Sequence, residues 1–95
     1  MITLTGTLIC LTAQDSAIVA RFLPGHIELS RAEHGCLWFR VDQSDDPLIW
    51  TLDEGFADAA AFAAHQARTR ASVWWDATQH IGRDFRLNDR AATAT

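Results

Sequence analysis

The amino-acid sequence predicts an α+β fold in which four antiparallel strands carry helices on one face. Three observations lead to this prediction: segments in which apolar side chains alternate with polar ones, segments in which they recur every three or four residues, and the order of these segments. The length of 95 residues suits one domain. We place this domain at residues 1–88 and expect residues 89–95 to form a flexible C-terminal tail.

The first strand is expected over residues 2–11, where apolar residues alternate with threonines. A helix should follow, with Asp15 or Ser16 as its N-cap. Pro24 and the glycine after it interrupt the helical pattern, because proline removes a hydrogen-bond donor from a helix interior. We therefore expect a kinked or broken helix that ends at Gly35.

The rest of the chain is expected to form a hairpin, two helical segments and a last strand. These are strands at residues 36–41 and 48–56 joined by a polar turn, a helix opening at Asp58, a helical segment through 74–81, and a strand at 83–88. The resulting order of strand, helix, strand, strand, helix, strand is that of a ferredoxin-like βαββαβ domain.

The expected hairpin strands carry apolar residues on both sides. Trp50 and Leu52 alternate with Ile49, and Phe39 alternates with Trp38. Helices cover only one face of a single sheet, so the other face needs a second partner. We therefore expect a homodimer in which two such sheets stack.

Composition and charge exclude several classes of partner. All eight basic residues are arginines scattered along a chain of net charge −4, so we expect no nucleic-acid partner. No run approaches the roughly 18 apolar residues of a membrane span, so we expect no membrane partner and a cytoplasmic location. Cys10 and Cys36 have no metal-ligand spacing and are interpreted as small buried apolar residues.

His65 is the strongest candidate for chemistry. It lies in an Ala-rich helix, close after Phe62, and precedes an aromatic-rich segment able to wall a pocket. In a dry cleft the pKa of its imidazole would suit proton transfer. The alternative is a structural role in which the ring bonds a backbone carbonyl. His26 and His80 are weaker candidates.

Trp74 and Trp75 point about 100° apart on a helix, so they cannot both face the same core. Trp74 shares a helical stripe with Thr78 and Ile81 and is expected to point inward. The other tryptophan should then line a cavity or an interface.

Glu54 places a carboxyl group among apolar neighbours on its strand. We favour an ion pair with Arg83 or Arg40, because a pair costs less than a lone buried charge. The alternative is a raised pKa and a catalytic role.

Three segments resemble the antibiotic biosynthesis monooxygenase family. They are Leu-Ser-Arg-Ala-Glu-His-Gly-Cys-Leu at residues 29–37, Glu-Gly-Phe-Ala-Asp at 54–58, and Ala-Phe-Ala-Ala-His at 61–65. The resemblance covers nearly the whole chain, and His34 stands where the family pattern has proline. It implies the dimeric α+β barrel, in agreement with the argument from the strands.

The resemblance also implies an activity: oxygenation of a quinol, phenolic or polycyclic aromatic molecule by O₂, with no metal, flavin or haem cofactor. The deprotonated substrate would supply the electrons. His65 would act as base or hydrogen-bond partner, and Trp74, Phe62, Trp50 and Arg83 would bind the substrate. We expect no metal site.

Two departures and two alternatives accompany this interpretation. Asn88 is the only asparagine, which disfavours the haem-degrading branch of the family, and the chain has no tyrosine to match the one that some members use. One alternative is a non-catalytic dimeric module that binds or senses an aromatic metabolite. The other is an enzyme of the same fold that performs isomerisation or decarboxylation.

Overall fold

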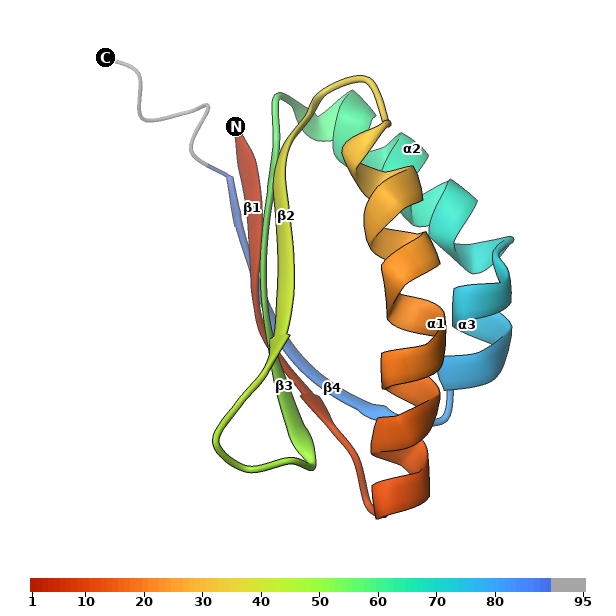
Figure 1. Cartoon of the computed structure of the whole chain (residues 1–95). Coiled ribbons are helices and arrows are strands. Elements are labelled where there is room, and N and C mark those ends of the chain that lie inside the picture. Colours follow the sequence, from red (N-terminus) through yellow and green to blue (C-terminus); the bar gives the residue numbers. More distant parts are fainter. Residues whose placement is uncertain (90–95) are drawn as a thin grey trace.

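In the computed structural model, which describes residues 1–89, three helices cover one face of a four-stranded antiparallel sheet (Figure 1). The elements in chain order are β1 (Ile2–Ile9), α1 (Ala13–Arg31), β2 (Cys36–Gln43), β3 (Ile49–Phe56), α2 (Ala59–Arg70), α3 (Val73–Thr78) and β4 (Gly82–Asp89). The strand order is β2-β3-β1-β4. This arrangement confirms the predicted ferredoxin-like fold class.

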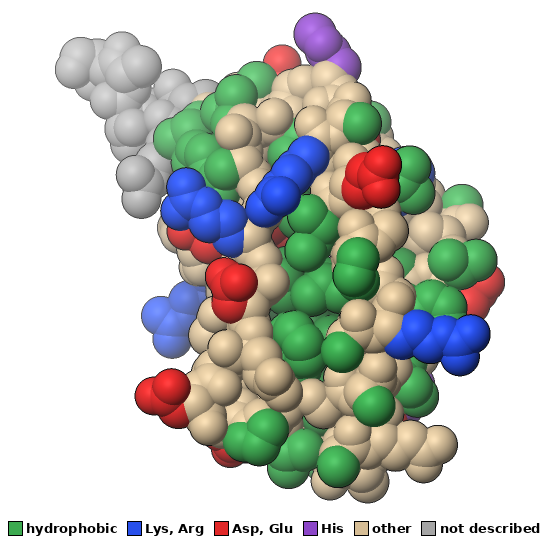
Figure 2. All heavy atoms as spheres, viewed as in Figure 1, with side chains coloured by type: hydrophobic (Ala, Val, Ile, Leu, Met, Phe, Trp, Pro, Cys, Tyr) green, Lys and Arg blue, Asp and Glu red, His purple; other side chains and the backbone are tan. Residues whose placement is uncertain are grey.

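The core lies between the helices and the inner face of the sheet. Hydrophobic side chains fill this seam in the space-filling view (Figure 2). The register aligns the inner side chains of neighbouring strands, since Leu4 of β1 lies opposite Glu54 of β3, which in turn lies opposite Phe39 of β2. All three are buried, so this row places a carboxyl group inside the core.

The helix α1 runs through Pro24 without a break, so of the two expected forms, kinked or broken, the broken one is wrong. Pro24 and Gly25 are exposed, whereas Leu23 and His26 on either side are buried against the core. The packing of these neighbours stabilises the helix at Pro24, which has no backbone N–H to donate a hydrogen bond. Neither this helix of 19 residues nor any other within residues 1–89 is long and apolar enough to cross a membrane.

The ends of α1 also differ from the prediction. Thr12 is the N-cap, and its hydroxyl accepts a hydrogen bond from the backbone N–H of Asp15, so the predicted cap lay three or four residues too late. The helix ends at Arg31 rather than Gly35. Gly35, with φ +86°, instead forms the turn into β2, a conformation that favours glycine.

The second half of the chain follows the prediction more closely. Asp58 caps α2 as expected, and its carboxylate accepts from the N–H of Ala61 at 2.8 Å. The last helical segment, α3, stops at Thr78, so Ile81 packs into the core from the following turn. Strand β4 extends to Asp89, and the remainder of the predicted tail, residues 90–95, lies outside the described residues.

The outer face of the sheet is more polar than expected. Threonines of β1 lie there beside charged residues of both neighbouring strands, as when Thr5 pairs with Asp53 and with Arg86. Trp38 covers Gly55 on this face and donates its indole N–H to Asp53 at 2.7 Å. The premise that both faces are apolar is therefore wrong, and the homodimer stays a prediction.

Candidate functional site

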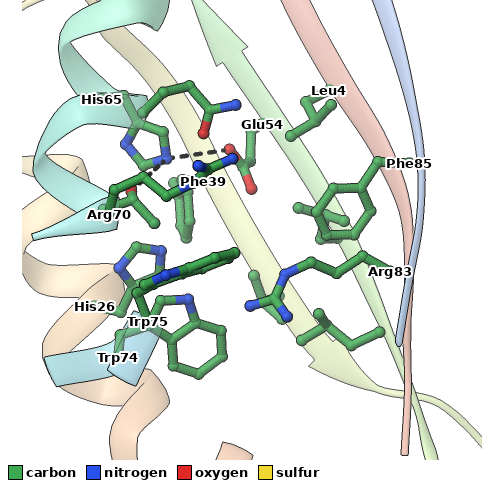
Figure 3. Close-up of a pocket in the computed structure, with 15 residues that line it drawn as sticks. Leu4, His26, Phe39, Glu54, His65, Arg70, Trp74, Trp75, Arg83 and Phe85 are labelled. Carbon is green, nitrogen blue, oxygen red and sulfur yellow. Dashed lines mark hydrogen bonds and ion pairs between the residues drawn. The ribbon is translucent and has the colours of Figure 1, made fainter. Parts of the chain in front are cut away.

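A cavity of about 160 Å³ lies between the helices and the inner face of the sheet. Its aromatic lining comes from Phe39, Trp74, Trp75 and Phe85, its polar lining from His26, Glu54, His65, Gln66, Thr69, Arg70 and Arg83 (Figure 3). An apolar protein cavity of about 150 Å³ holds one benzene molecule. The space therefore suits a ligand with a single aromatic ring.

His65 is the one buried residue of α2. The other positions of this Ala-rich helix are exposed or half-buried, so the helix presents the imidazole to the interior with an exposed fraction of 3%. Asp58 begins the helix in the turn after β3, and this short connection sets the ring beside β3. The prediction that His65 faces a pocket agrees with this placement.

Glu33 fixes the orientation of the His65 ring. Its Oε1 lies 2.6 Å from His65 Nδ1 and also accepts a hydrogen bond from Arg68 Nη2 at 3.2 Å. A carboxylate only accepts hydrogen bonds, so Nδ1 carries the proton and Nε2 keeps its lone pair. Nε2 lies 3.4 Å from the hydroxyl of Thr69 and 3.5 Å from Glu54 Oε1.

Glu54 is a buried carboxyl group with an exposed fraction of 4%. Its Oε1 makes no hydrogen bond with any described residue, because the 3.5 Å contact with His65 lacks hydrogen-bond geometry. The favoured ion pair with arginine is wrong. Arg83 donates to Thr78 and neighbouring carbonyls instead, and Arg40 is exposed, on the opposite side of β2 from the buried Phe39.

Burial keeps the carboxyl group of Glu54 and the imidazole of His65 uncharged at neutral pH. It raises the pKa of Glu54 to about 8, and the negative charges of Glu33 and Asp53 add to the effect. Burial also lowers the pKa of His65, although its hydrogen bond to Glu33 opposes the shift. At pH 7 a neutral carboxylic acid therefore faces a neutral imidazole. Within residues 1–89 no group of three or more His, Cys, Asp or Glu side chains is arranged to hold a metal ion.

His26 forms an uncharged wall of the cavity. Its ring stacks on Trp74 with centroids 4.9 Å apart and an interplanar angle of 6°, and it meets Phe39 edge-on. Burial lowers its pKa to about 3, and nearby positive charges contribute. The sequence carried a signal for this position, since His26 continues the buried helical stripe of Val19 and Leu23.

Both adjacent tryptophans line the cavity, Trp74 from within the core and Trp75 from a half-buried position. The guanidinium carbons of Arg70 and Arg83 lie 4.7 Å and 5.1 Å from the centre of the Trp75 ring. Arg83 is further held by Thr78, whose carbonyl and hydroxyl oxygens accept from it at 2.8 Å and 3.0 Å. This group of aromatic and cationic side chains forms one wall of the cavity.

The cavity brings together three of the predicted site residues, His65, Trp74 and Arg83. Phe62 and Trp50 are not among its lining residues. Phe62 packs edge-on against Phe56 at 5.4 Å, and Trp50 donates its indole N–H to Ser16, which ties β3 to α1. His80 lies in an exposed ion pair at the start of α1. Sequence patterns did not identify Glu33, Thr69 or Arg70 as site residues. Trp75 lines the cavity, one of the two places expected for the second tryptophan.

Solved structures resemble this fold over nearly its whole length. A protein from Deinococcus radiodurans, provisionally named an antibiotic biosynthesis monooxygenase, superposes with a TM-score of 0.81 at 22% identity, covering 94% of this chain and 91% of its own. A protein of the same provisional name from Nitrosomonas europaea gives 0.77 at 22% identity, with coverage of 94% and 97%. At these identities the likeness establishes the fold alone.

Comparison of the sequence itself identifies the family. A search of curated proteins found none that matches. The family model described as antibiotic biosynthesis monooxygenase matches residues 1–77. This stretch is more than three quarters of the chain and includes Glu33, Glu54 and His65. The protein therefore belongs to the antibiotic biosynthesis monooxygenase family.

Proposed function

We propose that this protein is a cofactor-independent monooxygenase that oxidises a quinol or phenol with O₂. The observation that carries the proposal is the meeting of a neutral imidazole and a neutral carboxylic acid, 3.5 Å apart, in the wall of an aromatic-lined cavity. Two groups of this kind, one basic and one acidic, are what a reaction that begins and ends with proton transfer requires. Family membership supports the same activity.

In the first step His65 acts as the base. Nε2 keeps its lone pair because Nδ1 donates to Glu33, so Nε2 can take the proton of a phenolic hydroxyl placed in the cavity. The negative charge of Glu33 then stabilises the imidazolium that forms. Removal of this proton makes the ring electron-rich enough to reduce O₂.

Glu54 supplies a proton later in the reaction. Its pKa of about 8 keeps it protonated at pH 7, so it can protonate the distal oxygen of a substrate peroxide as the O–O bond breaks. One oxygen atom enters the product and the other leaves as water. The substrate supplies all four electrons, so a hydroquinone would become a hydroxyquinone and no external reductant is needed.

We also propose that the protein works as a homodimer in the cytoplasm. The dimer is expected to form through the outer face of the sheet, where Trp38 and Ile9 provide apolar area among the threonines. Cys10 and Cys36 are free thiols, which suits a reducing compartment. Light scattering on the purified protein should give twice the chain mass of 10.6 kDa. A monomer at micromolar concentration would contradict the dimer.

Oxygen uptake tests the reaction. Chelator-treated protein should consume O₂ with one or more members of a panel of hydroquinones and phenols, after subtraction of spontaneous oxidation. His65→Gln and Glu54→Gln should each reduce this rate by about 10²-fold or more, the usual contribution of a general acid or base. Glu28→Gln, at an exposed position of α1, is the matched control and should leave the rate unchanged.

The outcomes separate the alternatives. Uptake that is equal in the wild type and the His65→Gln variant would contradict the assigned role. Ligand binding without uptake, with the ligand recovered intact, would favour a binding or sensing module. A product of unchanged oxygen content would favour isomerisation or decarboxylation.

A further inference from the structure

We infer that the aromatic ligand of this cavity carries an anionic group, and that Arg70 and Arg83 bind this group beside Trp75. That the ligand is aromatic rests on the proposed function. The new element is that the ligand carries a negative charge. A hydroxylated aromatic acid is the substrate class that follows.

The first argument is the charge of the cavity. Five ionisable residues line it: His26, Glu54, His65, Arg70 and Arg83. Burial leaves the first three uncharged at pH 7, because it lowers the pKa of both histidines and raises that of the glutamic acid. The remaining formal charges are two guanidinium groups. The lining is thus positive in a chain whose net charge is −4.

The second argument is that neither guanidinium has a carboxylate partner among the described residues. Arg83 donates to the carbonyl oxygens of Thr78 and Ile81 and to the hydroxyl of Thr78. The guanidinium of Arg70 lies over the ring of Trp75 and makes no side-chain hydrogen bond or ion pair within residues 1–89. Burial lowers the pKa of Arg83, and the like charge of Arg70 lowers it further, so the two cations repel each other. An anion bound beside them would offset both effects.

The third argument is the separation of the cavity into two chemically different ends. The pKa of Glu54 responds to burial and to the carboxylates of Glu33 and Asp53, and neither guanidinium counters that rise. Figure 3 shows the guanidinium of Arg83 apart from the contact between His65 and Glu54, on the other side of Trp75, whereas the guanidinium of Arg70 is drawn next to that contact. A single ring in a space of about 160 Å³ can direct a hydroxyl group to the His65 end and an anionic substituent toward Arg83, with Arg70 at the boundary between the two ends.

A matched pair of probes tests this inference without turnover. 4-Hydroxybenzoate and 4-hydroxybenzamide have nearly the same size and shape, resist oxidation by O₂, and differ in charge. Titration calorimetry at low salt should show at least tenfold tighter binding of the acid, and added salt should reduce the difference. Arg70→Gln should bring the two affinities to within about twofold of each other, whereas Arg70→Lys should retain part of the preference.

The same titrations provide a control variant and the results that would overturn the inference. Arg21→Gln removes an exposed guanidinium of α1 and should keep the full preference for the acid. Equal binding of acid and amide, absence of binding by both at millimolar concentration, or an unchanged preference in folded Arg70→Gln would each overturn the inference. A retained preference for the acid, combined with no oxygen uptake from any phenol, would instead overturn the proposed reaction and leave the anion site standing.

Discussion

Replacement of Glu54 by glutamine should stabilise the protein, and the gain should grow with pH. A glutamic acid in an unfolded chain has a pKa of about 4.3, whereas burial raises the pKa of Glu54 to about 8 in the folded protein. Between these two values the folded state holds a proton that the unfolded state has released. Folding stability is therefore lost as pH rises through this range.

The size of the effect follows from the two pKa values. Each pH unit in this window costs about 1.4 kcal/mol of unfolding free energy, so the penalty relative to an uncharged residue is about 1 kcal/mol at pH 5 and about 3.5 kcal/mol at pH 7. The exposed fraction of 4% means that solvent screens little of this penalty. The difference in stability between Glu54→Gln and the wild type should thus increase by roughly 2.5 kcal/mol from pH 5 to pH 7.

Urea denaturation followed by tryptophan fluorescence measures this difference at fixed protein concentration and at each pH. His26 titrates in both proteins and cancels in the comparison, although its lowered pKa makes both less stable in acid. Glu28→Gln, at an exposed position, should give a curve parallel to the wild type. Parallel curves for Glu54→Gln as well would refute the claim that Glu54 is buried and protonated.

Two further substitutions test the positioning of the site and the packing of the sheet. Glu33→Gln should lower kcat on the order of 100-fold with little change in KM, because the neutral amide no longer supplies the negative charge that stabilises the His65 imidazolium; an equal change in both constants would argue for a binding role. Gly55→Ala places a Cβ atom 2.5 Å from the ring of Trp38 and should cost about 1–3 kcal/mol in urea denaturation, and unchanged stability would show that the indole is free to move.

The sequence predicted the elements of this fold well, because each carries a strong local signal. Strand alternation located all four strands to within two residues at each end, and Asp58 marked the start of α2. The expectation of a kinked or broken helix at Pro24 was wrong about a break, since the packing of buried neighbours outweighs the local cost of proline. It was also wrong about the outer face, where alternation in the hairpin showed Trp38 and Ile49 but could not show that the threonines of β1 lie on the same face.

The site was less predictable, because its contacts join distant segments. His65, Trp74 and Arg83 were identified from local patterns and do line the cavity. The partners of His65 were not, since Glu33 lies 32 residues away and reaches the ring only after α1 and α2 pack together. An arginine partner for Glu54 was a reasonable expectation from charge balance. The fold instead places this carboxyl group in the core near Glu33 and Asp53, which raises the pKa of Glu54.

Isotopic labelling tests the central claim most directly. The protein, free of added metal, is incubated under ¹⁸O₂ with the hydroquinone that gives the fastest oxygen uptake, and the product is analysed by mass spectrometry. We expect one labelled oxygen atom per product molecule in the wild type, and loss of protein-dependent labelled product in His65→Gln. A product without label, or hydrogen peroxide formed in place of water, would contradict monooxygenation at the His65 and Glu54 pair.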